Sequence, residues 1–375
     1  MKPDTDIVCL SHLRWGFVYQ RPNHLMSRFA RERRTFFFEE PIFDASEPQL
    51  EMRRVNENLI VVTPHLPEAD HDKTIERQKQ VLDRLLHDFA VKDPVLWFYT
   101  PMALQFAPHI KPLLTVYDCM DELSHFDGAH PDIVHHEKQL FSRADLVFTG
   151  GHSLWEAKKQ HHPRVYPFPS SVEADHFKRA RTIAEDPPDQ ASIPHPRIGF
   201  FGVIDERMDL ELIAKIAEER PDWHLVMLGP VVKIDPKTLP KKDNIHWLGG
   251  KKYDELPHYL AGWDVAMMPF ALNQSTKFIS PTKTLEYLAA GKPVVSTAIR
   301  DVVRPYGEKG LVRIGDKDTF VREIALALEE DGTIRREAAD AHVARTSWDH
   351  TFKKMSALLH ETARTKQGAD RCSTT

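Results

Sequence analysis

The sequence predicts an α/β protein built from two Rossmann-like, doubly wound domains that face each other across a cleft. Three observations carry this prediction. The chain has 375 residues, more than one hydrophobic core usually supports. Short apolar runs alternate with amphipathic helical segments, which is typical of a mostly parallel sheet covered on both faces. A proline-rich segment without periodicity, 180–197, interrupts this alternation once.

The elements of the N-terminal half follow from apolar runs and helical periodicity. We expect strands at 6–11, 34–41, 59–65, 94–100 and 113–119 and in the runs DLVFTG and RVYPFPS, with helices at 21–33, 74–90 and 134–144. The alternation restarts with RIGFFGVI and ends in a helix at 347–363. The domains predicted are therefore 1–180, a linker at 181–196, 197–346, and a C-terminal helix with its tail at 347–375.

Composition excludes several classes of protein. The net charge is −5, which argues against general nucleic-acid binding. The three cysteines, Cys9, Cys119 and Cys372, lack the spacing of a disulfide scaffold or a thiolate zinc site. The N-terminus lacks the apolar core of a signal peptide, and no segment approaches ~18 uninterrupted apolar residues. We expect a cytoplasmic protein.

The segment FISPTKTLEYLAAGKPVV, 278–295, combines hydroxyls, a lysine and a glutamate at the start of a helix. Ser280 and Thr282 suit ordinary capping. Alternatively, the helix start and Lys283 bind a diphosphate, and Glu286, one turn further, accepts hydrogen bonds from a ribose diol. Capping alone gives no reason for Glu286. The pattern therefore favours a nucleoside diphosphate.

The segment GFFGVIDERMDLELI, 199–213, places Gly202 after a strand and Arg207 before a helix. It is not the GxGxxG pattern of dinucleotide-binding proteins. Gly202 allows a ligand close to the backbone, and Arg207 can pair with a phosphate. A plain turn with a solvated arginine explains the same residues.

The segment SPTKTLEYLAAGKPVVST resembles the donor-binding signature of GT-B glycosyltransferases related to family 4, the glycosyl transferases group 1. Further segments resemble that family in the expected order: RIGFFGVIDERMDLELI, DNIHWLGGKKYDELPHYLAGWDVAMMPF, RADLVFTGGHSLWEAK and VYPFPSSVEADHF. The segment WDHTFKKM resembles the closing helix that returns to the N-terminal domain. The N-terminal WGFVYQRPNHLMSRFA is similar to a subgroup linked to polysaccharide and teichuronic-acid-type assembly.

The resemblance implies a GT-B fold and a nucleotide-sugar donor, with UDP as the family expectation. The donor-binding residues that it implies are Gly202, Arg207, Gly249, Lys251, Ser280, Thr282, Lys283 and Glu286. Two positions depart from the family pattern. Val203 replaces the arginine of the phosphate-binding pair, and Phe278 replaces the first glutamate of the E-x7-E motif, which faces the transferred sugar.

The N-terminal domain is expected to supply the acceptor side. The segment VYDCMDELSHF ends a strand with Asp118, Asp121 and Glu122, which serve as base or sugar ligands or else cap the next helix. A metal site there is the weaker alternative because no DxD motif is present. The catalytic candidates are Asp118, Asp121, Arg207 and Lys283. The acceptor candidates are His12, Arg14 and Gly16 in the first strand-to-helix loop.

Arginines dominate the segment 21–34, where Glu32 is the single acid. This basic stripe is either a solvated helix face or a docking surface for anionic lipid formed by Arg28, Arg31, Arg33 and Arg34.

Three functions follow from the sequence. The first is a glycosyltransferase for a glycan or lipid-linked acceptor in polysaccharide or cell-envelope biosynthesis, retaining and independent of metal and other cofactors. The second is a sugar-nucleotide epimerase of the same fold. The third is a catalytically silent nucleotide-sugar-binding protein.

Overall fold

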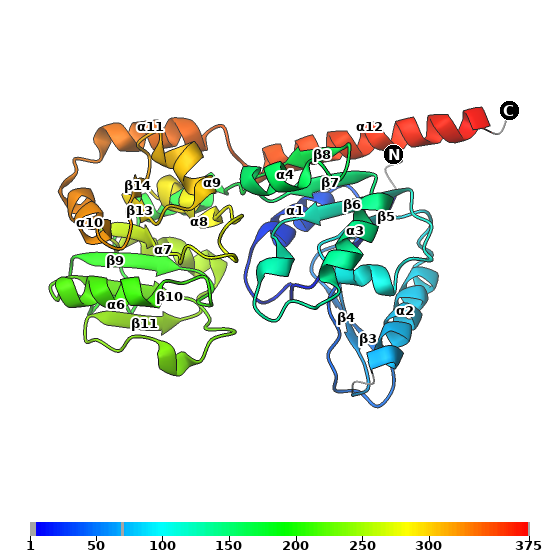
Figure 1. Ribbon diagram of the computed structural model, residues 1–375, viewed down its shortest axis with the longest axis horizontal. Coiled ribbons are helices and arrows are strands. Elements are labelled where there is room, and N and C mark those ends of the chain that lie inside the picture. The colour runs from blue at the N-terminus through cyan, green and yellow to red at the C-terminus, as the bar shows by residue number, and fades with distance from the viewer. Residues whose placement is uncertain (1–4, 69–70, 374–375) are drawn as a thin grey trace. The chain divides into compact units, whose positions relative to one another are not determined.

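The computed structural model describes residues 5–68 and 71–373, which divide into two compact units (Figure 1). Unit 1 comprises the chain up to Ser124, Gly128–Phe168 and the chain from Asp349 onwards. Unit 2 comprises His125–Asp127 and Pro169–Trp348. The sequence placed the end of the first domain at 180 and the start of the last helix at 347.

In the described chain, unit 1 holds an eight-stranded sheet of order β3-β4-β2-β1-β5-β6-β7-β8. Its neighbouring strands run parallel except the β3–β4 pair, which is antiparallel. The strands are β1 (Ile7–Leu10), β2 (Thr35–Phe38), β3 (Gln49–Arg54), β4 (Leu59–His65), β5 (Val95–Phe98), β6 (Leu114–Cys119), β7 (Leu146–Thr149) and β8 (Val165–Pro167).

The helices of unit 1 are α1 (Arg21–Phe29), α2 (His71–Asp88), α3 (Ile133–Arg143), α4 (His152–Lys158) and the long α12 (Trp348–Ser373). The first four lie between its strands along the chain, as crossover connections of parallel strands require, and α12 follows the last strand. The predicted return of the last helix to the N-terminal domain is confirmed, because Phe352 packs edge-on against Phe29 of α1 at 5.0 Å between ring centroids. Among the described helices, none is both long and apolar enough to cross a membrane.

Unit 2 holds a six-stranded sheet of order β11-β10-β9-β12-β13-β14, in which the described neighbours are parallel. The strands are β9 (Arg197–Phe201), β10 (His224–Leu228), β11 (Ile245–Gly249), β12 (Val265–Met268), β13 (Val294–Ser296) and β14 (Arg313–Ile314). The helices are α5 (Ala174–Lys178), α6 (Leu210–Glu219), α7 (Leu256–Ala261), α8 (Thr282–Ala289), α9 (Arg300–Val302), α10 (Phe320–Glu329) and α11 (Thr333–Val343).

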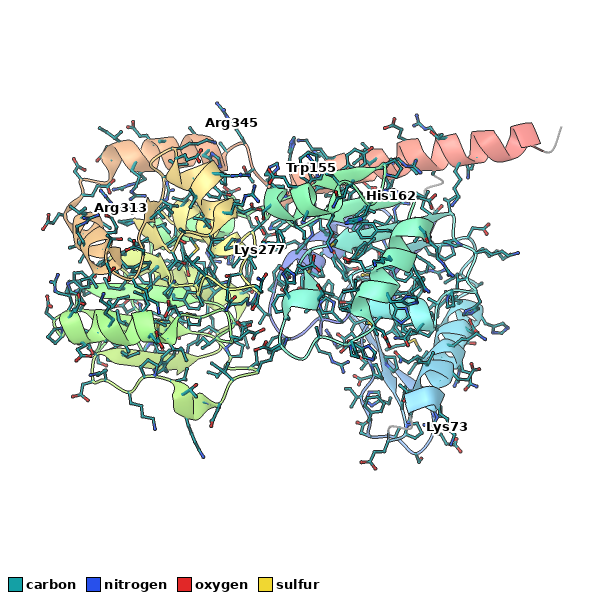
Figure 2. All side chains as sticks on the ribbon, in the orientation of Figure 1. Lys73, Trp155, His162, Lys277, Arg313 and Arg345 are labelled. Carbon is teal, nitrogen blue, oxygen red and sulfur yellow. The ribbon has the colours of Figure 1, made fainter. Side chains whose placement is uncertain are left out.

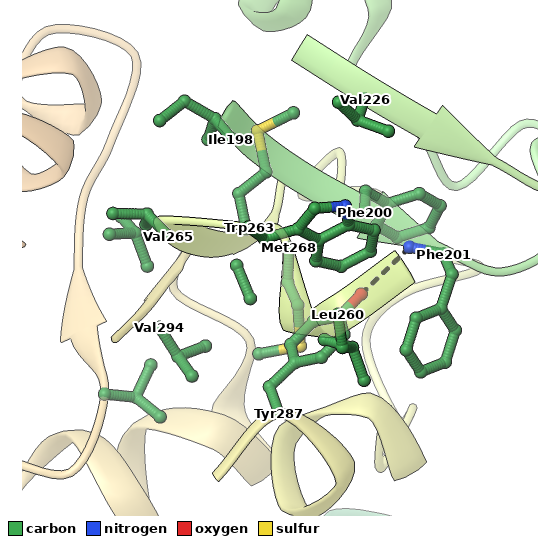
Figure 3. Close-up of a cluster of buried hydrophobic side chains, with 14 of the residues drawn as sticks. Ile198, Phe200, Phe201, Val226, Leu260, Trp263, Val265, Met268, Tyr287 and Val294 are labelled. Carbon is green, nitrogen blue, oxygen red and sulfur yellow. Dashed lines mark hydrogen bonds between the residues drawn. The ribbon is translucent and has the colours of Figure 1, made fainter. Parts of the chain in front are cut away.

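The core of unit 2 fixes α8 against β9 (Figure 3). Tyr287 of α8 is fully buried, and its hydroxyl accepts a hydrogen bond of 3.0 Å from the backbone N–H of Phe201. Trp263 packs over Gly199 of β9, where a Cβ atom would overlap the indole ring. Because Tyr287 is held in this way, the rest of α8, including Glu286, keeps one rotation relative to the sheet.

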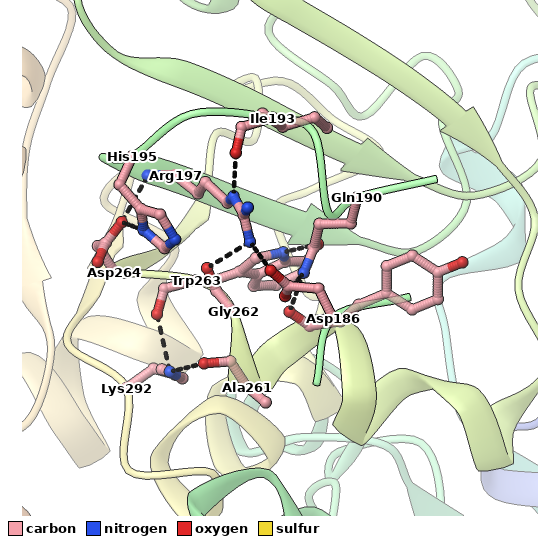
Figure 4. A network of polar contacts seen from close by, with 11 residues as sticks. Asp186, Gln190, Ile193, His195, Arg197, Ala261, Gly262, Trp263, Asp264 and Lys292 are labelled. Atoms are coloured by element: carbon pink, nitrogen blue, oxygen red, sulfur yellow. Dashed lines mark hydrogen bonds and ion pairs between the residues drawn. The ribbon is translucent and has the colours of Figure 1, made fainter. Parts of the chain in front are cut away.

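The proline-rich segment 181–196 contains no helix or strand beyond its first residue. It nevertheless packs against the rest of unit 2 through several side-chain contacts (Figure 4). The buried side chain of Gln190 bonds to the indole N–H of Trp263 at 3.0 Å. Arg197 donates to Asp186 at 2.6 Å and to the carbonyl of Ile193 at 2.7 Å. These contacts explain why the segment is part of unit 2.

The sequence analysis did not predict several short or exposed elements, among them β3 and α11. Strand β3 is mostly exposed, so it shows neither an apolar run nor alternation. Helix α11 carries charged residues on most of its surface and buries only Arg335, Ala339 and Val343.

The prediction that Arg28, Arg31, Arg33 and Arg34 form one exposed basic stripe is wrong. Helix α1 ends at Phe29, so Arg31, Arg33 and Arg34 do not share a helix face with Arg28. Arg28 and Arg33 are buried, and Arg34 binds Asp6 at 2.7 Å. Arg31 alone of the four keeps most of its side chain exposed, and it binds Asp349 at 2.8 Å. Arg28 reaches the same carboxylate at 3.1 Å.

Arg21 and Asp118 form a buried ion pair at the carboxyl edge of the unit-1 sheet. The guanidinium donates to both carboxylate oxygens over 2.8–3.1 Å, and its remaining Nη1 donates to the carbonyl of Phe168 at 2.7 Å. Asp118 is completely buried. A buried pair of this kind stabilises little by itself, but removal of one partner leaves a dehydrated charge.

We therefore expect Arg21→Met to lower the free energy of unfolding by about 3–5 kcal/mol in urea titrations. Adding Asp118→Leu should restore most of the loss, because both charges are then absent. Arg31→Ala, at an exposed ion pair, should cost less than about 1 kcal/mol. A double variant as unstable as the single one would contradict the buried-charge explanation.

Candidate nucleotide-sugar site

The floor of the candidate site, by which we mean the ends of β9, β10 and β11, is formed by the backbone of glycine residues. Gly202 and Gly229 follow β9 and β10 directly, with φ angles of 145° and 148° that favour glycine. A Cβ atom on Gly229 would overlap the carbonyl oxygen of Gly202. The N–H of Gly229 donates to the carbonyl of Gly249 at the end of β11, at 2.8 Å. Three adjacent strands thus end in glycine at the carboxyl edge, where ligands bind in open α/β sheets.

Lys283 lies directly against Gly202. A Cβ atom on Gly202 would overlap the Cε atom of Lys283 and approach its ammonium nitrogen to 2.7 Å. Gly202 therefore provides the space that the lysine side chain occupies. The arrangement brings a positive charge beside the end of β9 and the start of α8.

Arg207 lies in the loop that follows Gly202, and Asp205 orients its guanidinium. Its Nε and Nη2 atoms donate to the two Asp205 oxygens at 2.9 Å and 2.6 Å. Asp205 is buried, so part of the arginine charge is neutralised locally. Sequence reasoning missed Asp205, since an aspartate two residues before an arginine in a loop carries no distinctive pattern.

Helix α8 starts at Thr282, and among the described residues no side chain caps its first turn. The capping interpretation of Ser280 is therefore wrong. Ser280 instead accepts a hydrogen bond of 2.6 Å at its carbonyl from the hydroxyl of Ser170. Thr282 hydrogen-bonds to Glu286. This helix start, which has no side-chain cap within the described chain, presents the positive end of the helix dipole to an anion.

Glu286 is the most unusual group of the site. Its side chain is buried, and its Oε2 atom has no hydrogen-bond partner in the described part of the chain. Burial raises the pKa of Glu286 to about 7, against the opposing effects of the Lys283 charge and the Thr282 hydrogen bond. Glu173 adds a smaller increase through its negative charge. A buried carboxylate oxygen without a hydrogen-bond donor is suited to accept a hydrogen bond from a ligand.

The nucleotide contact predicted for Lys251 involves its backbone and stays a prediction, while its side chain is engaged elsewhere. Its ammonium binds Asp189 of the 181–196 segment at 2.6 Å and lies near the ring of Tyr259. Its charge therefore serves to hold that segment. Gly249, two residues earlier, keeps a backbone role at the floor of the site.

Position 278 lies in the loop between β12 and α8. Phe278 is half-buried, and the ammonium of the exposed Lys277, labelled in Figure 2, lies 5.2 Å from its ring centroid. The aromatic ring offers no hydrogen-bond acceptor where the related pattern has a carboxylate.

The acidic residues predicted in unit 1 differ in their ion-pair partners. Asp118 is buried in its pair with Arg21, which explains its position without a catalytic role. Glu122 binds Lys158 at 2.6 Å. Asp121, the residue before Glu122, is half-buried. Among residues 5–68 and 71–373, no cluster of three or more histidine, cysteine, aspartate or glutamate side chains could hold a metal ion.

The predicted acceptor residues lie in the β1–α1 loop. The Arg14 guanidinium donates to the carbonyls of Glu40 and Pro41 and to the carboxylate of Glu39, and so joins this loop to the one after β2. His12 is half-buried, and the space beside Gly16 is open. The assignment of these residues to an acceptor remains a prediction.

Comparisons with known proteins agree with this geometry. Residues 195–330, most of unit 2, match the model of the family described as glycosyl transferases group 1. The predicted resemblance is confirmed for this stretch of the chain, which includes Glu286.

One curated relative is TuaH of Bacillus subtilis (strain 168), whose name assigns it to teichuronic acid biosynthesis as a glycosyltransferase. It is 28% identical over 166 residues, which are 42% of this chain and 41% of the relative. The match thus spans about two fifths of the relative's length.

Solved structures of GT-B glycosyltransferases share the fold over nearly the whole chain. Sucrose-phosphate synthase from Thermosynechococcus elongatus has a TM-score of 0.70 at 14% identity and covers 95% of this chain and 98% of its own. An α,α-trehalose-phosphate synthase (UDP-forming) from Burkholderia vietnamiensis has a TM-score of 0.71 at 13% identity, covering 96% and 100%. The predicted GT-B class of fold is confirmed.

The raised pKa of Glu286 has a consequence for stability. Between pH 4.5 and about 7 the carboxyl is ionised in the unfolded chain but protonated in the folded one, so the folded state loses relative stability as pH rises through this range. We expect Glu286→Gln to raise the free energy of unfolding at pH 8 by a few kcal/mol, at roughly 1.4 kcal/mol per pKa unit. At pH 4 the variant and wild type should unfold alike in urea. Equal stability at both pH values would contradict the assignment.

Proposed function

We propose that this chain is a glycosyltransferase that moves a sugar from a nucleoside-diphosphate sugar to a glycan or lipid-linked acceptor in polysaccharide or cell-envelope biosynthesis. The observation that carries the proposal is Glu286, a buried carboxylate with an unpaired oxygen one turn from Lys283 and the uncapped start of α8. A ribose diol supplies the missing donor, and the diphosphate meets the lysine and the helix start.

UDP is the nucleotide that we propose, on the support of the fold neighbours. One of them is a trehalose-6-phosphate protein from E. coli solved with UDP-2-fluoro glucose, with a TM-score of 0.70 at 12% identity. The proposal that the sugar is added to a cell-envelope polysaccharide is supported by the name of the Bacillus subtilis relative.

Chemistry at this site depends on stabilising the leaving nucleoside diphosphate. Lys283 and the first N–H groups of α8 face the developing negative charge, and Arg207, oriented by Asp205, adds to them. We propose that these groups suffice without a divalent ion and that the reaction retains the configuration of the sugar.

The acceptor side of the proposal uses the β1–α1 loop with His12, Arg14 and Gly16. Membrane contact through the four arginines is incompatible with the burial of Arg28 and Arg33. Asp118 is also buried, in its ion pair with Arg21, so we do not propose it as a catalytic residue. Asp121 is kept as a proposed catalytic residue.

A catalytically silent nucleotide-sugar-binding protein is the second candidate function. It is favoured by Phe278, which replaces a carboxylate of the family pattern, and by the ion pair that holds Asp118 against Arg21. Product analysis with a glycan acceptor distinguishes the two functions, since the silent protein binds the donor and returns it unchanged. An epimerase would release an isomerised donor.

Calorimetry with UDP, GDP, ADP and TDP tests the donor site. We expect one nucleoside diphosphate to bind the wild type and to bind Glu286→Gln at least tenfold more weakly, because a hydrogen bond to a charged acceptor contributes ~1.5–3 kcal/mol. As pH drops below about 7, where Glu286 becomes protonated, wild-type affinity should fall more steeply than that of the variant, in which only the terminal phosphate of the nucleotide titrates. Undiminished binding by a folded Glu286→Gln would remove the ribose assignment.

Activity in the presence of EDTA tests the proposed independence from metal. We expect turnover to persist, because Lys283 and the helix start neutralise the diphosphate. Complete loss in chelator, with recovery on adding magnesium or manganese, would show that a cation bound with the substrate is required.

A further inference from the structure

Glu206 is a second carboxylate at the carboxyl edge of the unit-2 sheet, and the roles described so far leave it without one. It lies in the loop between β9 and α6, next to Arg207. Both of its carboxylate oxygens are buried, and neither has a hydrogen-bond partner among the residues that the structure describes. An ionised carboxylate has about four acceptor positions, so a buried one without donors is costly to the fold.

The neighbouring cation, Arg207, donates no hydrogen bond to Glu206. The Nε and Nη2 atoms of Arg207 are directed to Asp205. A buried carboxylate that a protein keeps without an internal donor calls for a donor from outside the chain.

The loop that carries Glu206 is fixed at the candidate site. It begins at Gly202, against which Lys283 lies. The side-chain amide of Asn273 donates to the carbonyl of Glu206 at 3.1 Å, and the N–H of Ala271 donates to the carbonyl of Arg207 at 2.8 Å. Both partners belong to the loop between β12 and α8, which also contains Phe278. Glu206 is therefore held beside the loop in which an expected carboxylate is missing.

Charge decides which part of a nucleotide sugar Glu206 can meet. A carboxylate repels a diphosphate, which Lys283 and the start of α8 attract. Glu286, further along α8, is committed to the ribose. The transferred sugar is the remaining part of the donor, and its neutral hydroxyl groups are the donors that Glu206 lacks.

We propose that Glu206 accepts hydrogen bonds from hydroxyl groups of the transferred sugar and so contributes to the choice of that sugar. This inference rests on the proposed function, because it assumes a nucleotide-sugar donor. It assigns to the β9–α6 loop the sugar-binding carboxylate that Phe278 cannot supply.

The test compares a nucleoside diphosphate with its sugar conjugate on the same full-length protein. Calorimetry with UDP, GDP, ADP and TDP first identifies the nucleotide, and then UDP-glucose, GDP-mannose, ADP-glucose or TDP-glucose and their epimers serve as the paired probes. For Glu206→Gln we expect unchanged affinity for the nucleoside diphosphate and at least a tenfold weaker affinity for the preferred sugar conjugate. Glu286→Gln should weaken both. Glu185→Gln, at an exposed glutamate of the 181–196 segment, is the matched control and should weaken neither.

Each other outcome has a definite meaning. An equal loss for nucleotide and conjugate in Glu206→Gln, or no loss in either, overturns the sugar contact while the proposed donor site stands. If no nucleoside diphosphate binds the wild type, the proposed function fails and this inference fails with it. A melting temperature of Glu206→Gln at or above the wild-type value shows that the variant is folded, and Glu206→Asp provides a second variant that keeps the charge but shortens its reach.

Discussion

The close approach of backbone at Gly202 and Gly229 is the constraint on which the candidate site depends. No side chain fits on Gly229 without striking the carbonyl of Gly202, and none fits on Gly202 without displacing Lys283. The ends of β9 and β10 therefore carry no side chain, and the half-buried Lys283 lies against Gly202. Tyr287 then fixes the rotation of α8 by its bond to Phe201, so that Glu286 is buried rather than exposed. A packing requirement thus determines the electrostatics of the site.

The two units treat buried carboxylates in opposite ways. Asp118 receives three hydrogen bonds from Arg21 over 2.8–3.1 Å and is fully satisfied. Glu286 and Glu206 keep buried oxygens without partners within the described chain. A satisfied buried charge holds a fold together, whereas an unsatisfied one weakens it and persists where a ligand supplies the donor. Hydrogen-bond partners, rather than residue type or burial, therefore distinguish Asp118 from the two carboxylates for which we propose ligands.

The sequence was informative where the interaction is local. Apolar runs predicted the buried parallel strands, and the helix with Lys283 and Glu286 was recognisable because both residues lie within one turn. It failed where the partner is distant: Arg28 meets Asp349, 321 residues away, so a residue expected at the surface is internal. The same limit applies to Asp118, whose partner Arg21 is 97 residues away, and to Glu206, whose isolation is a property of the folded chain.

Helix α1 shows what such distant contacts accomplish. Arg21 donates to the carbonyl of Phe168, the last residue of unit 1 before the chain enters unit 2. Arg28 binds the carboxylate of Asp349, the first residue of unit 1 after the chain leaves unit 2. One helix therefore anchors both ends of the segment that forms most of unit 2. The arginines of α1, which composition suggested were a surface for solvent or lipid, are explained by the need to fix these two ends within unit 1, where long side chains with several donors reach backbone and carboxylate together.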